Sequence, residues 1–451
     1  MTLRAGLQAL KALAAAGVVI LVGVALMGPS AFSLGGSSTP DVRALSQERA
    51  LFVRGRSVFR FDTFGDQAFW GGALHLHRAI EGRKLGGVGP GVSPKTALAV
   101  GLKVDVSALP AAVKRGIKNG SVDLNDPATT LALLKLNAVV GVKGFFNQGG
   151  TLSGVGITCA FCHSTVNNSF LPGIGQRLDG WPNRDLNVGA IISLSPSLKP
   201  FTSLLGVSAA TVRKVLHAWG PGKFDAELEL DGKGFQPNGR SAATLLPAAF
   251  GLAGVNLHTY EGWGSVTYWN AFVANLEMHG QGTFFDPRLN NAKKFPIAAK
   301  AGFANVRHTP DLITKKLAAL HFYQLGLRAP LPPKGSFDMA AARRGKVLFN
   351  TVAQCSSCHV PPLFTEPGWN LHRPKEICTD SFQARRGPTN RYRTTPLAGL
   401  WTHQKGGFYH DGRFATLAAV VRHYNSCMDL GLSGSQQGDL VQYLLGIGRV
   451  K

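Results

Sequence analysis

Two pentapeptides of the form Cys-x-x-Cys-His carry the residue types and the spacing from which chemistry can be inferred. They are Cys159-Ala160-Phe161-Cys162-His163 and Cys355-Ser356-Ser357-Cys358-His359. Two thiols three residues apart can bond to the two vinyl groups on one edge of a porphyrin, and the adjacent imidazole can then coordinate its iron. Chance and a zinc site are the alternatives, and two copies in one chain argue against both. We therefore expect two covalent haem c groups, with His163 and His359 as iron ligands.

The first 33 residues have the order of a secretory signal. Arg4 and Lys11 precede an uncharged run from Ala12 to Met27, and small residues follow as far as Ser33. The apolar run is long for a signal and slightly short for a span, so an uncleaved membrane anchor is the alternative. In either case we expect export to the periplasm, with membrane association through this segment in the second case.

The two remaining cysteines, Cys378 and Cys427, both follow the second pentapeptide. An oxidising compartment permits disulfides, so we expect these two thiols to pair rather than to bind a metal.

The chain carries a net charge of +23. A field of this sign favours encounter with acidic redox proteins, anionic lipid head groups or anionic polymers. Adaptation to an unusual exterior is the alternative, and it would leave the charge without a specific partner. The basic residues are scattered and no nucleic-acid motif accompanies them, so we expect no nucleic-acid binding.

Helical periodicity dominates the chain and long β-alternation is scarce, which predicts a mainly α fold. We expect two cytochrome c-like haem domains, the first enlarged by loop-rich insertions. Pro330, Pro332 and Pro333 place the boundary in the segment 327–335, giving domains 34–335 and 336–451. Helices are predicted over residues 41–60, 129–140, 208–218, 338–349 and 435–445, and an irregular loop over 164–200.

The last two of these helices can close a cytochrome fold. Gly345 and Phe349 lie four residues apart on one face of the first, and Leu440, Tyr443 and Leu444 form an apolar edge on the second. We expect the terminal helix to pack across the helix that contains Gly345.

The C-terminal half resembles the di-haem cytochrome c peroxidase and MauG superfamily. The resemblance rests on the segments 393–397 (RTTPL), 407–412 (GFYHDG), 416–417 (TL) and 420–425 (VVRHYN). In that superfamily the second haem takes its distal ligand from the region after HDG-TL, which implies Tyr424 here. A phenolate is an anionic donor that would lower the haem potential. His423 and Met428 are rival ligands, and a buried structural Tyr424 is the alternative.

The N-terminal half resembles the same superfamily in fewer residues. Gly173-Ile174-Gly175-Gln176 and Pro182-Asn183-Arg184 occupy the place of its Gly-His and Arg-Asn segments. Gln176 stands near the position of the switchable distal histidine, and no histidine occurs between His163 and His217. The resemblance thus implies a first haem with an open distal position. The alternative is ligation from farther away by His75, His77, His217, His258 or His279.

The resemblance to this superfamily also implies roles for further residues. Tyr260-Glu261-Gly262 and the later Asn270 resemble the segment between the haems, so Tyr260, with Trp263 and Trp269 close by, would carry electrons or a radical. Glu277 and His279 are the nearest candidates for the distal acid-base group. Asn183, Thr394 and Pro396 resemble the positions that hold a calcium ion between the domains, although Thr-Pro can also simply shape a turn.

These residues together imply an oxidoreductase that reduces hydrogen peroxide, or activates dioxygen, at the haem of His163. The haem of His359 would relay electrons from a small acidic periplasmic donor, a cytochrome c or a cupredoxin. The wide separation of the two motifs is also similar to that in di-haem rubber oxygenases. The rival hypothesis is a non-enzymatic di-haem electron carrier with both irons six-coordinate.

Overall fold

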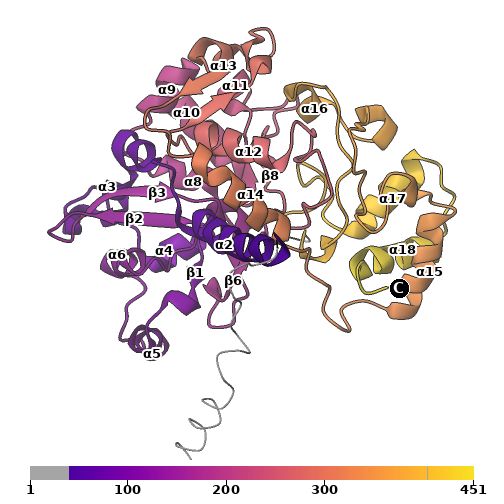
Figure 1. Cartoon of the computed structure of the whole chain (residues 1–451), viewed down its shortest axis with the longest axis horizontal. Coiled ribbons are helices and arrows are strands. Elements are labelled where there is room, and N and C mark those ends of the chain that lie inside the picture. The colour runs from indigo at the N-terminus through magenta and orange to yellow at the C-terminus, as the bar shows by residue number, and fades with distance from the viewer. Residues whose placement is uncertain (1–39, 404, 451) are drawn as a thin grey trace, which may run out of the picture. The chain divides into compact units, whose positions relative to one another are not determined.

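The computed structural model describes residues 40–403 and 405–450 (Figure 1). Contacts between Cα atoms divide the chain into two compact units, Met1–Ala50 and Leu51–Lys451. The described part of the first unit is the beginning of helix α2 (Pro40–Phe61). The predicted leader, residues 1–33, lies outside the described residues.

Helices predominate in the larger unit, which confirms a mainly α fold. Before residue 240 they are α3 (Leu76–Glu81), α4 (Pro94–Ala99), α5 (Ala111–Asn119), α6 (Pro127–Lys135), α7 (Ala160–His163), α8 (Val188–Ser193), α9 (Lys199–Leu205), α10 (Ala209–Trp219) and α11 (Leu228–Asp231). Later helices are α12 (Val266–Phe272), α13 (Pro296–Ala301), α14 (Leu317–Gly326), α15 (Met339–Asn350), α16 (Phe382–Arg386), α17 (Leu417–Cys427) and α18 (Gly434–Gly446). Two π-helical turns, η2 (Ala68–Ala73) and η5 (Val273–Glu277), accompany them.

The strands of the described chain are short and form two-stranded pairs. The antiparallel pairs are β2 (Val142–Phe146) with β3 (Leu152–Ile157), β4 (Ser164–Val166) with β6 (Arg177–Asp179), β7 (Lys223–Phe224) with β8 (Thr244–Leu245), and β9 (Thr283–Phe285) with β10 (Asn305–Arg307). The parallel pair is β1 (Val104–Asp105) with β5 (Ile174–Gly175).

Four predicted helices are confirmed, and local capping explains three of them. The helix expected over 41–60 is α2. Ser208, Asp338 and Ser433 cap α10, α15 and α18, because each side-chain oxygen accepts a hydrogen bond from a backbone N–H of the first turn. The sequence reveals such caps because donor and acceptor lie within three residues of each other.

Two predicted segments differ from the structure. The helix expected over 129–140 ends at Lys135, because Asn137 adopts a positive φ of 51° that a helix cannot continue. The irregular loop expected over 164–200 contains β4, β5, β6, α8 and the start of α9. Pairing of β4 with β6 and capping of α8 by Asn187 supply this order.

Helices α15, α17 and α18 lie side by side (Figure 1). Gly345 is required at the crossing of α15 and α18, because a Cβ atom there would lie 2.0 Å from the Asp439 carbonyl oxygen. The rings of Phe349 and Tyr443 meet at 5.1 Å beside it. The predicted packing of the terminal helix is therefore confirmed.

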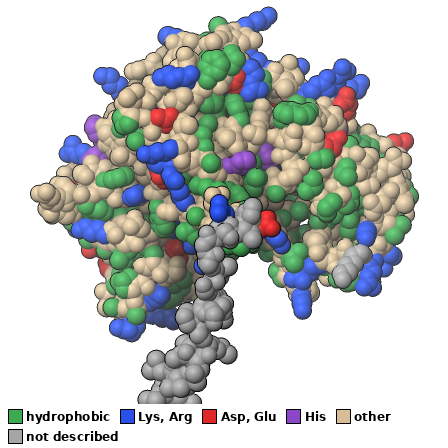
Figure 2. Space-filling model, viewed as in Figure 1, with side chains coloured by type: hydrophobic (Ala, Val, Ile, Leu, Met, Phe, Trp, Pro, Cys, Tyr) green, Lys and Arg blue, Asp and Glu red, His purple; other side chains and the backbone are tan. Residues whose placement is uncertain are grey.

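The described chain has no helix or strand from Leu327 to Asp338, but one compact unit includes both sides of this segment. The division into domains at residue 335 stays a prediction. Among residues 40–403 and 405–450, no helix is both long and apolar enough to cross a membrane. Lys and Arg side chains are spread over the face shown in Figure 2 instead of gathering in one patch.

Candidate functional site

The first pentapeptide begins directly after β3 and forms the single turn α7. Nδ1 of His163 donates a hydrogen bond of 3.1 Å to the Pro247 carbonyl oxygen. This bond fixes the orientation of the ring and leaves Nε2 as the free nitrogen, an arrangement that metal-binding histidines commonly use.

Cys159, Cys162 and His163 line a cavity of about 1480 Å³, a volume that includes its opening to solvent. Much of its wall is apolar, with Trp70, Phe161 and Leu246 among the lining residues. Thiols, a free imidazole nitrogen and an apolar wall together fit a covalently attached haem.

Three of the predicted catalytic residues, Tyr260, Asn270 and Glu277, line this cavity. The Tyr260 hydroxyl donates to the Leu245 carbonyl oxygen at 3.1 Å, and the Asn270 amide donates to Gln324 at 2.7 Å. Burial raises the pKa of Glu277 well above its usual range, and neighbouring carboxylates add to the shift. This shift favours the protonated form of the Glu277 side chain.

The other two predicted catalytic residues lie elsewhere. Gln176 is exposed between β5 and β6, and its backbone is hydrogen-bonded to Asn167. It does not line the cavity, because the pairing of β4 with β6 holds this turn at the surface. His279 is also outside the lining: its ring stacks on Phe69 at 3.6 Å, and its Nε2 lies 3.4 Å from a Glu229 carboxylate oxygen.

Of the five histidines considered as distant ligands, His258 is the one that lines the cavity. Its Nε2 donates to the Val255 carbonyl oxygen at 3.1 Å, and its buried Nδ1 has no hydrogen-bond partner in the described chain. Burial lowers the pKa of His258 to about 4, so the ring is neutral at pH 7. His75 and His217 are exposed.

Tyr260 joins the cavity to the C-terminal segment with the HDG sequence. Leu245, whose carbonyl accepts from the Tyr260 hydroxyl, donates its N–H to the His410 carbonyl oxygen at 2.7 Å. The Tyr260 and His410 rings lie 6.2 Å apart. Arg393 donates its backbone N–H to the Tyr260 carbonyl oxygen at 3.0 Å. Trp263 instead packs in an aromatic cluster with Trp269, Phe272 and Phe295.

The second pentapeptide repeats the geometry of the first. Cys355–Ser357 form a 3₁₀ turn after α15, and Nδ1 of His359 donates to the Phe364 carbonyl oxygen at 3.2 Å. The His359 ring therefore also has its Nε2 free for a metal. Cys358 lies near Glu366 and His372. One possible metal-ligand atom from each of the three side chains lies within 4.8 Å of the other two. A thioether bond to haem would engage the Cys358 sulfur and leave Glu366 paired with His372 at 2.6 Å.

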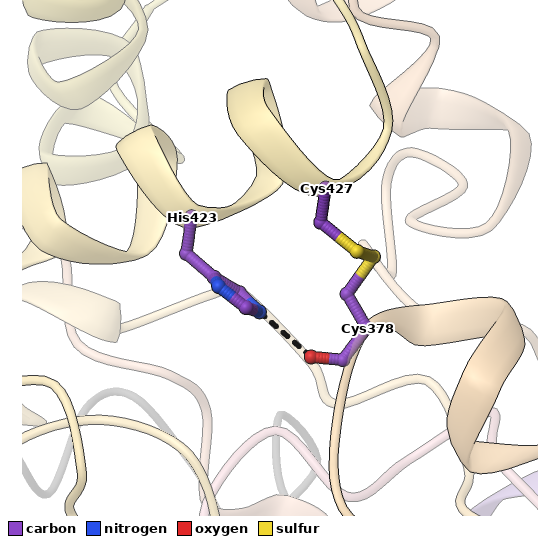
Figure 3. The surroundings of a disulfide bond; sticks show 3 residues. All are labelled: Cys378, His423 and Cys427. Carbon is purple, nitrogen blue, oxygen red and sulfur yellow. Dashed lines mark hydrogen bonds between the residues drawn. A yellow bond between two sulfur atoms is a disulfide. The ribbon is translucent and has the colours of Figure 1, made fainter.

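Tyr424 lies on α17 close to these thiols. Burial raises its pKa, and the proximity of Cys355 and Cys358 adds to the shift. The two rival ligands are placed differently: Met428 is exposed, and His423 Nε2 donates to the Cys378 carbonyl oxygen at 2.7 Å (Figure 3). The structure thus brings Tyr424 towards the second pentapeptide, while His423 has a backbone partner.

Cys378 and Cys427 form a disulfide with their Cα atoms 6.3 Å apart (Figure 3). The predicted pairing is confirmed. The bond ties α17, and hence Tyr424, to the loop before α16.

The residues proposed for calcium engage separate partners. The Asn183 amide donates to the Gly101 carbonyl oxygen and accepts from the Asp185 N–H. The Thr394 hydroxyl is bonded to the Glu366 carboxylate, and its carbonyl oxygen accepts from the Thr365 hydroxyl. The calcium site at Asn183, Thr394 and Pro396 stays a prediction.

A group of buried charges beside the cavity was not predicted. Arg386 pairs with Asp225 at 2.8 Å and with Asp231 at 2.9 Å, and all three side chains are almost fully enclosed. Glu227 and Glu261 lie next to them and line the cavity. A signal was available: four of the 25 acidic residues fall within the seven residues from Asp225 to Asp231.

No protein-family model and no curated protein matches this chain. A solved structure of hydrazine synthase from Kuenenia stuttgartiensis, pressurised with 20 bar xenon, aligns with a TM-score of 0.28 and 15% sequence identity. The alignment covers 51% of this chain and 92% of that chain. A likeness at this score carries no inference about function.

Proposed function

We propose that the chain is a periplasmic di-haem c-type oxidoreductase similar to the di-haem cytochrome c peroxidases and MauG. Its reaction would be the reduction of hydrogen peroxide, or the activation of dioxygen, at the haem bound by Cys159, Cys162 and His163. The observation that carries the proposal is that a buried carboxyl group, that of Glu277, lines the cavity of that pentapeptide. An electron carrier has no need of a buried acid at its haem, whereas cleavage of an oxygen–oxygen bond requires proton donors.

The haem groups would supply the redox chemistry when bound. His163 would hold one group from its Nε2, with the ring oriented by the Pro247 carbonyl. Glu277 would give its proton to the oxygen atom that leaves, and the apolar wall would exclude bulk water. Tyr260, in contact with the HDG segment, would lie on the route by which electrons arrive from the second site.

The second site would store and relay electrons. His359 and Tyr424 would hold its haem, which would supply the redox chemistry, and the donor would be a small acidic cytochrome c or cupredoxin. The disulfide between Cys378 and Cys427 supports an oxidising compartment, such as the periplasm, because such bonds are rare in reducing cytosol.

A non-enzymatic electron carrier is the second candidate, and His258 favours it. Its unpartnered Nδ1 is buried at the cavity, so this nitrogen is available to occupy the distal position of the first haem. Both irons would then be six-coordinate and closed to peroxide.

Electron paramagnetic resonance of the ferric, haem-loaded protein separates the two candidates. The enzyme predicts a high-spin signal from the first haem that peroxide alters. Two low-spin haems unaffected by peroxide would contradict the enzyme hypothesis. Conversion of one of them to high spin in His258→Ala would then support the electron carrier, in which His258 binds the first haem. Glu277→Gln should slow the reaction with peroxide while leaving the high-spin signal in place.

A further inference from the structure

Three carboxyl groups share the wall of the cavity of the first pentapeptide: Glu227, Glu261 and Glu277. Glu227 and Glu261 are only 3% and 2% exposed, and each has one carboxylate oxygen without a hydrogen-bond partner in the described chain. Such oxygens are costly to bury as anions, so they favour bound protons.

The neighbouring positive charge is too small to keep all of these groups ionised. Arg386 acts on the charge of Glu227, but it already pairs with Asp225 and Asp231. Burial raises the pKa of Asp225 and Glu227 to about 7, and the like charges of the neighbouring carboxylates contribute. The group therefore retains protons near neutral pH that isolated carboxyl groups would have lost.

A route to solvent begins at Glu229 and His279. Both side chains are partly exposed, and His279 Nε2 lies 3.4 Å from Glu229. The charges of Glu229 and Glu227 both raise the pKa of Glu277, so these carboxyl groups are near enough to influence one another. The remaining titratable or charged groups that face them are Arg386, Arg393, Lys233, Asp225, Asp231, Tyr260 and Tyr392.

We propose that Glu227, Glu261 and Glu277 form a proton store on the wall of the haem cavity, refilled from solvent through Glu229 and His279. The inference rests on the proposed function and assigns its proton source. Reduction of one hydrogen peroxide breaks the oxygen–oxygen bond and forms two waters. It consumes two electrons, which the one-electron donor protein supplies through the second site, and two protons, which the store supplies.

The test measures protons without peroxide. The haem-loaded full chain is reduced electrochemically in weakly buffered solution between pH 6 and 8, and a pH indicator reports proton uptake. Because added electrons raise the proton affinity of nearby carboxyl groups, the unmodified protein should take up protons. Glu227→Gln and Glu261→Gln should each lower the uptake by about one third, since each removes one of the three titrating groups of the store.

Three further variants test whether the carboxyl group must line the cavity, whether protons enter through Glu229, and whether the effect is due to packing. Glu81→Gln is the matched control, because Glu81 is also buried with a raised pKa but lies outside the cavity lining; its uptake should equal that of the unmodified protein. Glu229→Gln should slow uptake several-fold without changing its final amount. Glu227→Asp, which keeps a carboxyl group, should restore uptake and so separates proton binding from packing; circular dichroism and haem absorption check folding.

Unchanged uptake in Glu227→Gln and Glu261→Gln, or no uptake by the unmodified protein, would overturn the store. Failure of the proposed function looks different. If the protein does not consume peroxide but shows the expected pattern of proton uptake, the proton store is supported and the peroxidase function is contradicted. If the protein consumes peroxide but the variants do not change proton uptake, the peroxidase function is supported and the proton store is contradicted.

Discussion

The guanidinium of Arg386 lies 2.8 Å from the Asp225 carboxylate, and both side chains are almost completely enclosed by protein. Arg386 ends α16, whereas Asp225 precedes α11, so the pair connects the C-terminal part of the chain to the wall of the first cavity. Removal of one partner from a buried ion pair leaves an uncompensated charge, which costs more than the pair itself contributes.

Arg386→Met should therefore lower the free energy of unfolding by about 3–5 kcal/mol, measured by urea denaturation at pH 7. Arg344→Met is the control, because Arg344 pairs with Asp439 at the surface, where solvent screens the charges; little change is expected. Equal losses in the two variants would show that burial of the Arg386 pair has no special importance.

Tyr424→Phe should change the spectrum and the reduction potential of the second haem, because it removes the phenolate that we assign to the iron. Absorption spectroscopy and potentiometry check this. Tyr443→Phe alters a buried tyrosine of α18, which packs against α17, and should have no effect. A change in Met428→Leu or His423→Gln, with none in Tyr424→Phe, would transfer the ligand role to that residue.

Tyr260→Phe should slow electron transfer between the two haems, since the Tyr260 hydroxyl is the group hydrogen-bonded towards His410 through Leu245. Rapid-mixing spectroscopy after partial reduction measures this rate. Trp263→Phe is the comparison, because Trp263 packs within an aromatic cluster. A slower rate in Trp263→Phe alone would mean that the tryptophan, and not Tyr260, carries the electron.

Because the carboxyl group of Asp66 is buried, we expect the stability of the protein to depend on pH. Asp66 is fully buried, its Oδ2 accepts from the Ile157 N–H, and burial raises its pKa well above the usual range. Between the unfolded and folded pKa values the folded state binds the extra proton, so stability is greatest at low pH and falls as pH rises through this window. Asp66→Asn should flatten that fall and make the protein more stable at pH 8 than the unmodified protein is.

Urea denaturation at pH 5 and pH 8 provides the measurement for Asp66. Asp126→Asn serves as the control, because Asp126 is exposed and an asparagine can cap α6 in its place. An identical pH slope for the unmodified protein and Asp66→Asn would contradict the assignment.

Local signals account for most of what the sequence predicts correctly. The helices expected over 208–218 and 338–349 and the packing at Gly345 each depend on residues a few positions apart, or on one residue whose size limits the packing. The mainly α fold follows from the same kind of periodicity. Gln176 is different, because its position depends on how β4 pairs with β6, which the spacing of residues does not reveal.

The buried carboxyl groups were missed for a related reason. A net charge of +23 directs attention to basic residues, and the acidic run at 225–231 resembles an ordinary solvated segment when it is considered alone. Its meaning depends on Arg386 and Glu261, which are distant in sequence and meet the run only in the folded chain. Sequence alone thus identified residues on the cavity wall but not the charges behind them.

The disulfide has a consequence for how the chain matures. In the proposed periplasmic haem protein, six thiols would enter one oxidising compartment, and six cysteines allow 15 complete pairings. Two of the thiols would have to oxidise with each other, while the four of the pentapeptides would have to remain reduced until haem is attached. Cys378 and Cys427 follow all four in the sequence, so during vectorial export they would emerge last. Order of emergence would then help to direct each sulfur to its proper bond.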